Sequence, residues 1–202
     1  PMDPETVRRI AYELMTKDQA REFENELEMN LSHLDRAVGN FRINIFRQRG
    51  TLALVIRYVR SSVPPFEQLR LPPVLLDMVM AKRGLVLVAG ATGSGKSTTL
   101  AAMIDYRNSN QSGHILTIED PIEYLYEHRR SIVNQREIGI DTQTYQLALQ
   151  NALREAPDLI MIGEIRDKET MQSALLHTLT GHLCLATLHA NNSYHALNRI
   201  IS

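Results

Sequence analysis

Residues 90–98, with the sequence Gly-Ala-Thr-Gly-Ser-Gly-Lys-Ser-Thr, match the phosphate-loop pattern G-x-x-x-x-G-K-[ST]. The glycines let the backbone curl, so that main-chain N–H groups can point at phosphate oxygens. Lys96 would bridge the β- and γ-phosphates of a nucleotide, and Ser97 would offer its hydroxyl to Mg²⁺. The predicted nucleotide-binding residues are therefore Gly90, Ala91, Thr92, Gly93, Ser94, Gly95, Lys96, Ser97 and Thr98. A glycine-rich turn without a ligand is the alternative interpretation.

Three later apolar runs each end in a polar cluster. The clusters are Glu119 to Glu123, Gly163 to Asp167 and His189 to Asn192. Taken singly, such clusters usually only solvate a loop. In a parallel sheet, however, the carboxyl ends of the strands meet at one edge, where ligands bind. We therefore expect all three clusters to lie beside the phosphate loop.

The second of these clusters departs from the usual magnesium-binding strand end. In that pattern an apolar strand ends in an aspartate, whereas here Gly163 takes the aspartate's position and Glu164 follows. Asp158 comes before the strand, at its wrong end. The prediction is that Ser97 and Glu164 hold Mg²⁺, partly through water, and that the carboxylates of 119–123 share in neutralising the charge. Glu123 is predicted to orient and deprotonate the attacking water, and the reverse assignment of the two glutamates stays open.

The histidines and arginines supply further candidates. His189 shares the edge with the phosphate loop and is predicted to sense or donate to the γ-phosphate, although a lone histidine is more often a satisfied loop residue. His182, at the opposite end of the same strand, is predicted to make a structural or inter-subunit contact. A group of arginines in the first part of the chain could reach the nucleotide of a neighbouring domain or subunit, unless it is only a solvated face. Its members are Arg42, Arg47, Arg49, Arg57 and Arg60.

Apolar runs and helical patterns alternate after residue 73, which predicts an α/β fold with helices on both faces of a sheet. The predicted strands are 85–89, 114–118, 131–135, 159–162 and 183–188. The predicted helices are 73–82, 97–109, 143–155, 168–180 and 193–201. This order places the phosphate loop between the first of these strands and the helix that follows it.

A smaller α+β domain is predicted before this core. Its helices are Pro4 to Met15 and Thr16 to Glu28, with Thr16 as an N-cap, and its strands, joined as a hairpin, are 40–46 and 51–59. Pairs of prolines then punctuate the segment before the core. The predicted division is an N-terminal domain at 1–62, a linker at 63–73 and the ATPase domain at 74–202.

The composition, with 44% hydrophobic and 22% charged residues, is that of an ordinary globular protein. The formal net charge of −1 argues against a surface that coats nucleic acid, so no nucleic-acid partner is expected. Cys184 lies in an apolar run and is expected to be a reduced core residue of a cytoplasmic protein. No apolar stretch approaches the ~18 residues that cross a membrane, and no signal peptide opens the chain. The proline at the start and the unfinished helical pattern at the end are those expected of a fragment.

Four motifs in this order resemble those of the secretion ATPase superfamily. They are 90–98 (Walker A), Thr117 to Glu123 (Asp box), Ala156 to Asp167 (atypical Walker B) and Thr180 to Asn192 (His box). Within the superfamily, the chain resembles the PilT/PilU retraction ATPases of bacterial type IV pili. The segments Tyr106-Arg107-Asn108 and Leu-His-Ala-Asn-Asn at 188–192 are closer to the PilU-like form. The resemblance implies a RecA-like P-loop NTPase core with a smaller PAS-like N-terminal domain.

The resemblance also implies a function: an ATPase that hydrolyses ATP with Mg²⁺ and drives type IV pilus retraction in twitching motility. The full-length protein would form a homo-hexamer on the cytoplasmic face of the inner membrane of a Gram-negative bacterium. It would contact a platform protein of that membrane and could assemble with a PilT paralogue. The residues carried over by motif are Lys96 and Ser97 for phosphates and Mg²⁺, Glu123 of the Asp box, Glu164 of Walker B, His182 and His189 of the His box, and Arg42 and Arg57 of the N-terminal domain.

Two alternatives stay open. A related ATPase of type II secretion or conjugation would carry the same motifs, although the branch that assembles pili usually has a four-cysteine zinc motif and this sequence has one cysteine. A PilT-dependent accessory subunit with little hydrolysis of its own would also keep Lys96, Glu123 and Glu164.

Overall fold

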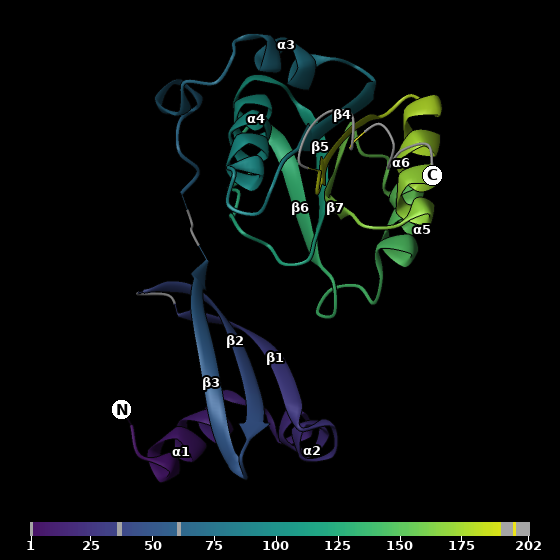
Figure 1. Ribbon diagram of the computed structural model, residues 1–202. Helices are drawn as coiled ribbons and strands as arrows, with labels where there is room; N and C mark the ends of the chain where they lie inside the picture. Colours follow the sequence, from purple (N-terminus) through teal and green to yellow (C-terminus); the bar gives the residue numbers. More distant parts are fainter. Residues whose placement is uncertain (1, 36–37, 60–61, 191–195, 197–202) are drawn as a thin grey trace. The chain divides into compact units, whose positions relative to one another are not determined.

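The computed structural model describes residues 2–35, 38–59, 62–190 and 196. The chain divides into two compact units, Pro1–Ser61 and Ser62–Ser202. Figure 1 draws the first unit in purple to blue and the second in blue to yellow. Each unit has its own sheet and its own hydrophobic core.

The first unit is a three-stranded antiparallel sheet with two helices. Its elements are α1 (Pro4–Leu14), α2 (Lys17–Glu26), β1 (Glu28–Asp35), β2 (Gly39–Gln48) and β3 (Thr51–Val59), with the strands in the order β1-β2-β3. The predicted cap of α2 is confirmed, because the Thr16 hydroxyl accepts from the N–H of Gln19 while the Gln19 side chain accepts from the N–H of Thr16. Phe23 and Ile45 are fully buried in the core of this unit.

Strand β1 corrects the predicted order of elements. The sequence predicts a helix up to Glu28 and no strand until the hairpin, but the helix ends at Glu26 and β1 follows at once. Leu27 adopts the left-handed conformation, with φ of 65°, and thereby ends the helix. The sequence did contain a sign of this strand, since alternation buries Met29 and Leu31 on one face.

The second unit is an α/β fold built on a five-stranded parallel sheet, which confirms the predicted fold class. Its helices are η1 (Phe66–Leu69), α3 (Val74–Met80), α4 (Lys96–Asn110), α5 (Tyr145–Glu155) and α6 (Lys168–Leu179). Its strands are β4 (Gly84–Ala89), β5 (Gly113–Glu119), β6 (Ser131–Glu137), β7 (Leu159–Ile165) and β8 (Leu183–Leu188). They lie in the order β4-β8-β7-β5-β6, and every neighbouring pair is parallel.

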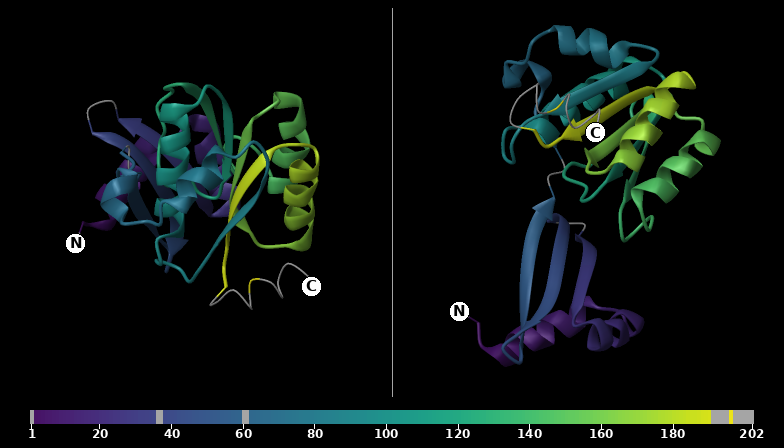
Figure 2. Two further views of the ribbon diagram at one scale, coloured as in Figure 1. Left: turned by 90° about the horizontal axis from the view of Figure 1, so that it is seen from above. Right: turned by 45° about the vertical axis from the view of Figure 1, so that its right-hand side comes forward.

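Helices cover both faces of this sheet, as Figures 1 and 2 show. Helices α3 and α4 pack on one face over a cluster that includes Met103, Ile115 and Leu159. Helices α5 and α6 pack on the other face over a cluster that includes Leu149 and Ile160. The central strands are therefore buried on both sides, which explains why their sequences are nearly all apolar rather than alternating.

One strand extends beyond its predicted end. The run predicted at 159–162 continues to Ile165, so Gly163 and Glu164 lie within the end of β7 rather than after it. The pairing of β7 with β8 shifts at this point, and such an irregularity re-aims the side chains of a strand end. The helix predicted at 193–201 lies outside the described residues except for residue 196. None of the described helices is long and apolar enough to cross a membrane.

Candidate nucleotide-binding site

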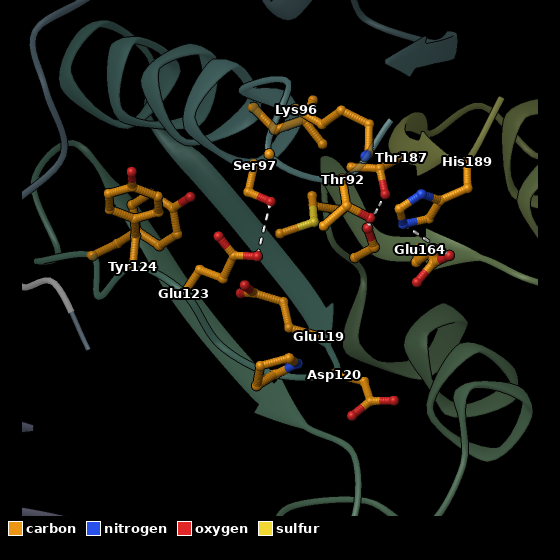
Figure 3. Close-up of a pocket in the computed structure, with 16 residues that line it drawn as sticks. Thr92, Lys96, Ser97, Glu119, Asp120, Glu123, Tyr124, Glu164, Thr187 and His189 are labelled. Atoms are coloured by element: carbon orange, nitrogen blue, oxygen red, sulfur yellow. Dashed lines mark hydrogen bonds and ion pairs between the residues drawn. The ribbon is translucent and has the colours of Figure 1, made fainter. Parts of the chain in front are cut away.

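A pocket lies where the phosphate loop meets the ends of β5, β7 and β8 (Figure 3). All three polar clusters contribute to it, which confirms the prediction that they share one edge of the sheet. The residues that line it are Thr92, Gly93, Lys96, Ser97, Leu100, Glu119, Asp120, Pro121, Glu123, Tyr124, Tyr126, Met161, Gly163, Glu164, Thr187 and His189.

The phosphate loop has the backbone shape that its glycines predict. Gly93 and Gly95 have φ of 76° and 93°, a left-handed conformation that L side chains rarely adopt. Helix α4 begins directly after them, so the unpaired N–H groups of its first turn lie at the pocket. Lys96 is 9% exposed, and its ammonium donates to the carbonyl oxygens of Gly90 and Ala91, each at 2.9 Å. These two bonds hold the ammonium of Lys96 against the phosphate loop.

The first turn of α4 is tied to the segment that follows β5. Ser97 Oγ donates to Glu123 Oε1 at 3.0 Å, and Thr98 Oγ1 lies 3.0 Å from the hydroxyl of Tyr124. The Ser97 hydroxyl therefore faces a carboxylate, and oxygen donors of this kind are the ligands that Mg²⁺ prefers. Among the described residues, no group of three or more His, Cys, Asp or Glu side chains is arranged to hold a metal ion.

The position that an aspartate takes in the usual Walker B pattern has little room for a side chain here. A Cβ on Gly163 would lie 3.2 Å from Cα of Glu119 and 3.1 Å from the hydroxyl of Tyr145, both tighter than ordinary contacts. Close packing of β7 on β5 thus accounts for the glycine, and Glu164 supplies the acidic group instead. The Tyr145 hydroxyl is buried and has no hydrogen-bond partner in the described part of the chain. Burial raises the pKa of Tyr145, which keeps this hydroxyl neutral.

Glu164 is held between two basic side chains. Its Oε2 accepts from Arg166 Nε at 2.8 Å, and its Oε1 lies 3.3 Å from His189 Nε2. Arg166 also donates to Asp120 Oδ2 at 3.1 Å, which joins the end of β7 to the segment after β5. The hydrogen bond to Glu164 raises the pKa of Arg166. Figure 3 shows Glu164 and His189 together at one side of the pocket.

Glu119 is the most deeply buried of the carboxyls that line the pocket, at 6% exposed. Its Oε1 accepts from Thr117 Oγ1 at 2.7 Å and from Gln135 Nε2 at 3.3 Å. Burial raises the pKa of Glu119 to about 7, against the lowering effect of these hydrogen bonds. In Figure 3 its carboxyl points into the pocket, towards Glu123.

Other predicted residues do not line this pocket. His182 lies at the amino end of β8, where its Nδ1 is 3.1 Å from the carbonyl oxygen of His177 and the two rings meet edge to face at 5.8 Å. Arg42 and Arg57 belong to the first unit and are directly opposite each other on β2 and β3. Asp158 lies at the amino end of β7, as its place in the sequence indicates, and accepts a backbone N–H from β5 at 2.8 Å.

Sequence reasoning missed three polar residues of the pocket, Tyr124, Tyr126 and Thr187, besides the apolar Leu100 and Met161. Thr187 Oγ1 donates to the carbonyl oxygen of Gly163 at 2.5 Å and so fixes the end of β7. Isolated tyrosines and threonines beside apolar runs are typical of core positions, so composition does not mark them. Only their positions in the sequence, close to the carboxyl ends of β5 and β8, could have indicated that they line the pocket.

Residues 22–202 match the family described as type II/IV secretion system protein. The chain is 51% identical to the type IV pilus ATPase PilU of Pseudomonas aeruginosa over 201 residues, which cover 100% of this chain and 53% of that protein. It is 44% identical to the type IV pilus retraction ATPase PilT of the same bacterium, over 100% of this chain and 58% of PilT. A crystal structure of the pilus retraction motor PilT with bound ADP matches with a TM-score of 0.92 and 47% identity, over 96% of this chain and 57% of that chain. The chain thus spans a little more than half the length of these relatives.

Proposed function

We propose that the chain forms the ATP-hydrolysing part of a type IV pilus motor, because it belongs to the family of type II/IV secretion system proteins, as a PilT/PilU-type secretion ATPase. The observation that carries this proposal is one pocket in which a phosphate loop meets Glu123, Glu164 and His189. The activity, the substrate and the partners of the whole protein are all part of the proposal.

The proposed ligand is ATP with Mg²⁺. On binding, the Lys96 ammonium would exchange the carbonyl oxygens of Gly90 and Ala91 for β- and γ-phosphate oxygens. The hydroxyl of Ser97 would hold Mg²⁺ together with Glu164, partly through water, and the ion would neutralise charge on the phosphates. The ADP bound in a PilT structure, at a TM-score of 0.92, supports a nucleotide in this fold.

Glu123 is the proposed base, and His189 the proposed sensor of the γ-phosphate. Both carboxylate oxygens of Glu164 are engaged, by Arg166 and by His189, whereas Glu123 accepts a hydrogen bond from the hydroxyl of Ser97 in the first turn of the phosphate-loop helix. This contrast favours Glu123 at the attacking water and Glu164 at the metal.

Force would come from movement between domains. ATP makes contacts in a closed state that ADP cannot make, so its differential affinity biases a two-state element. We place the N-terminal domain at 1–62, the hinge at 63–73 and the ATPase domain at 74–202, with Arg42 and Arg57 reaching a nucleotide in the closed state. A homo-hexamer at the inner membrane, engaging a platform protein, would convert successive closures into pilus retraction.

One observation favours a second function. The identity to PilU, at 51%, is higher than the identity to PilT, at 44%. An accessory subunit that assembles with a PilT paralogue would bind nucleotide in the same pocket and hydrolyse little of it alone. The two functions differ in turnover by the isolated protein.

Steady-state ATPase activity of the full-length protein, with ring assembly measured in parallel, tests the proposal. We expect Mg²⁺-dependent hydrolysis that Lys96→Ala and Glu164→Ala each reduce by about a hundredfold or more. Glu169→Ala, an exposed position in the first turn of α6, is the matched control and should retain activity. Assembled rings that bind ATP without hydrolysing it would contradict the motor and favour the accessory subunit.

A further inference from the structure

The face of the sheet that packs against α4 changes from apolar to polar at the ends of β5 and β6. Along this face the cross-strand pairs are Ile115 with Val133, Thr117 with Gln135, and Glu119 with Glu137. Thr117, Glu119 and Glu137 are buried, at 0%, 6% and 4% exposed. Buried polar groups are costly unless they are hydrogen-bonded, so the bonds that they make are informative.

Gln135 uses both ends of its amide on the segment that follows β5. Its Oε1 accepts from the backbone N–H of Tyr126 at 2.9 Å, and its Nε2 donates to the backbone carbonyl of Tyr124 at 2.8 Å. The same Nε2 lies 3.3 Å from Glu119 Oε1, which fixes the orientation of the amide. A single side chain on β6 therefore binds two backbone groups on the far side of Glu123.

Glu137 binds the same segment on the near side of Glu123. Its Oε2 accepts from the backbone N–H of Ile122 at 3.0 Å. Its own N–H donates to Asp141 Oδ2 at 2.8 Å, so the turn after β6 holds the strand end that carries this carboxylate. Glu123 thus lies between two backbone attachments, at Ile122 and at Tyr124.

We propose that Gln135 and Glu137 are positioning residues, which hold segment 120–126 so that the carboxylate of Glu123 meets the attacking water beside the γ-phosphate. Residues 120–130, all of them described, form no helix or strand between β5 and β6, so side-chain bonds have to set their path. The segment is held against the first turn of α4, the phosphate-loop helix. Glu123 contacts Ser97 there, and Tyr124 contacts Thr98.

This inference rests on the proposed function, because it assigns these two side chains a part in hydrolysis at the same pocket. A shift of about 1 Å in a catalytic group costs on the order of a hundredfold in rate. Neither Gln135 nor Glu137 lines the pocket itself, so nucleotide affinity should change little. A loss in kcat without a matching loss in binding is therefore the expected signature.

The test uses four variants of the full-length protein. Gln135→Met and Glu137→Met keep much of the side-chain volume and remove the hydrogen bonds, whereas Glu137→Gln keeps an oxygen that can accept from Ile122. Asn134→Met, an exposed position on the opposite face of β6, is the matched control. We expect kcat to fall about tenfold to a hundredfold in the first two variants, with KM for ATP and the Kd for ADP within about threefold of the parent. Glu137→Gln and Asn134→Met should keep most of the parent kcat.

Hydrogen exchange of the backbone amides gives a readout that does not depend on turnover. The N–H of Tyr126 should exchange faster in Gln135→Met, and that of Ile122 faster in Glu137→Met, with β5 and β7 unchanged. Unchanged exchange in 120–126, an unchanged kcat, or a loss of ADP binding in parallel with kcat would each overturn the inference. A parent protein that does not hydrolyse ATP would contradict the motor proposal alone, since the exchange rates would still decide whether these side chains hold the segment.

Discussion

Among single residues, Glu119 gives the pocket its clearest dependence on pH. Burial raises the pKa of this carboxyl from 4.5 to about 7. Between these two values the unfolded chain is ionised at Glu119 while the folded protein still holds the proton. The folded state binds more protons in that window, so the free energy of unfolding falls as pH rises through it and levels off above about pH 7.

Replacing Glu119 by glutamine removes this contribution. The free energy of unfolding of the parent, relative to Glu119→Gln, should fall by about 2 kcal/mol between about pH 5.5 and 8. Urea unfolding of both proteins at the two pH values measures it, with the exposed Glu169→Gln as control. A difference between parent and variant that stays constant with pH would show that this carboxyl does not titrate in the window.

Residue types in the pocket could be predicted from the sequence, but most of their partners could not. Phosphate binding by a loop of this kind requires glycines, a lysine and a hydroxyl residue at fixed spacing, so Lys96 and Ser97 can be recognised from the local sequence alone. The contact from Arg166 to Asp120 joins positions 46 residues apart, and no local pattern records it. The packing that excludes a side chain at Gly163 depends in the same way on a neighbouring strand.

At the scale of elements, α4 connects the phosphate loop to the rest of its unit through two buried polar side chains. Arg107 is 2% exposed and donates to the carbonyl oxygens of Val79 at 2.6 Å and Ala81 at 2.9 Å, at the end of α3. Asn108 is fully buried and donates to the carbonyl oxygen of Glu127 at 2.7 Å. The helix that begins at the pocket is therefore fixed at its other end to two separate segments.

Arg107→Met tests how much this attachment contributes. The substitution leaves two carbonyl oxygens without their donor, and we expect the free energy of unfolding to fall by about 2 kcal/mol. Denaturant unfolding measures it. Arg154→Met, an exposed arginine in the last turn of α5, is the matched control and should change the free energy of unfolding by less than about 0.5 kcal/mol. Equal effects of the two substitutions would mean that the buried bonds of Arg107 add nothing.

Most elements of the second unit could be predicted because strands and helices there have distinct patterns. Its central strands are short apolar runs, and its helices begin and end near the punctuation that the sequence shows. Strand β1 was missed because it directly follows a helix, with one left-handed residue, Leu27, as the whole connection. The alternation of apolar and polar residues in β1 is short and is flanked by polar residues. The sequence pattern therefore predicts that the preceding helix continues to Glu28.

At the scale of the whole molecule, the proposed motor depends on the arginines of the first unit. Arg42 and Arg57 face each other across β2 and β3. We propose that they reach the nucleotide of a neighbouring ATPase domain, because sites of phosphoryl transfer can receive an arginine from a neighbouring subunit.

Arg57→Ala should lower kcat of the assembled protein by about a hundredfold or more, because an arginine stabilises charge in the transition state of phosphoryl transfer. ADP affinity should stay close to that of the parent, since the pocket is lined by residues of the second unit. Arg21→Ala on α2, which pairs with Asp18 at the surface, is the control. An unchanged kcat in assembled rings would exclude Arg57 from the reaction.

The fold class of the whole chain could be predicted, but the order of strands could not. Alternation of strands and helices indicates a parallel sheet, and a parallel sheet places its chemistry at one edge. Nothing in the sequence pattern distinguishes the observed order β4-β8-β7-β5-β6 from others. That order places β7 between β5 and β8, so that Arg166 reaches Asp120 after β5 while Glu164 reaches His189 after β8.

The proposed mechanism depends most on Glu123, which would activate water for attack on ATP bound at the phosphate loop. Single-turnover hydrolysis by full-length Glu123→Gln, beside the parent and with ATP affinity measured on the same samples, tests it most directly. We expect ATP affinity within about threefold of the parent and hydrolysis slower by about a hundredfold to ten-thousandfold. Hydrolysis by Glu123→Gln at the parent rate would exclude Glu123 as the base and assign that role to Glu164.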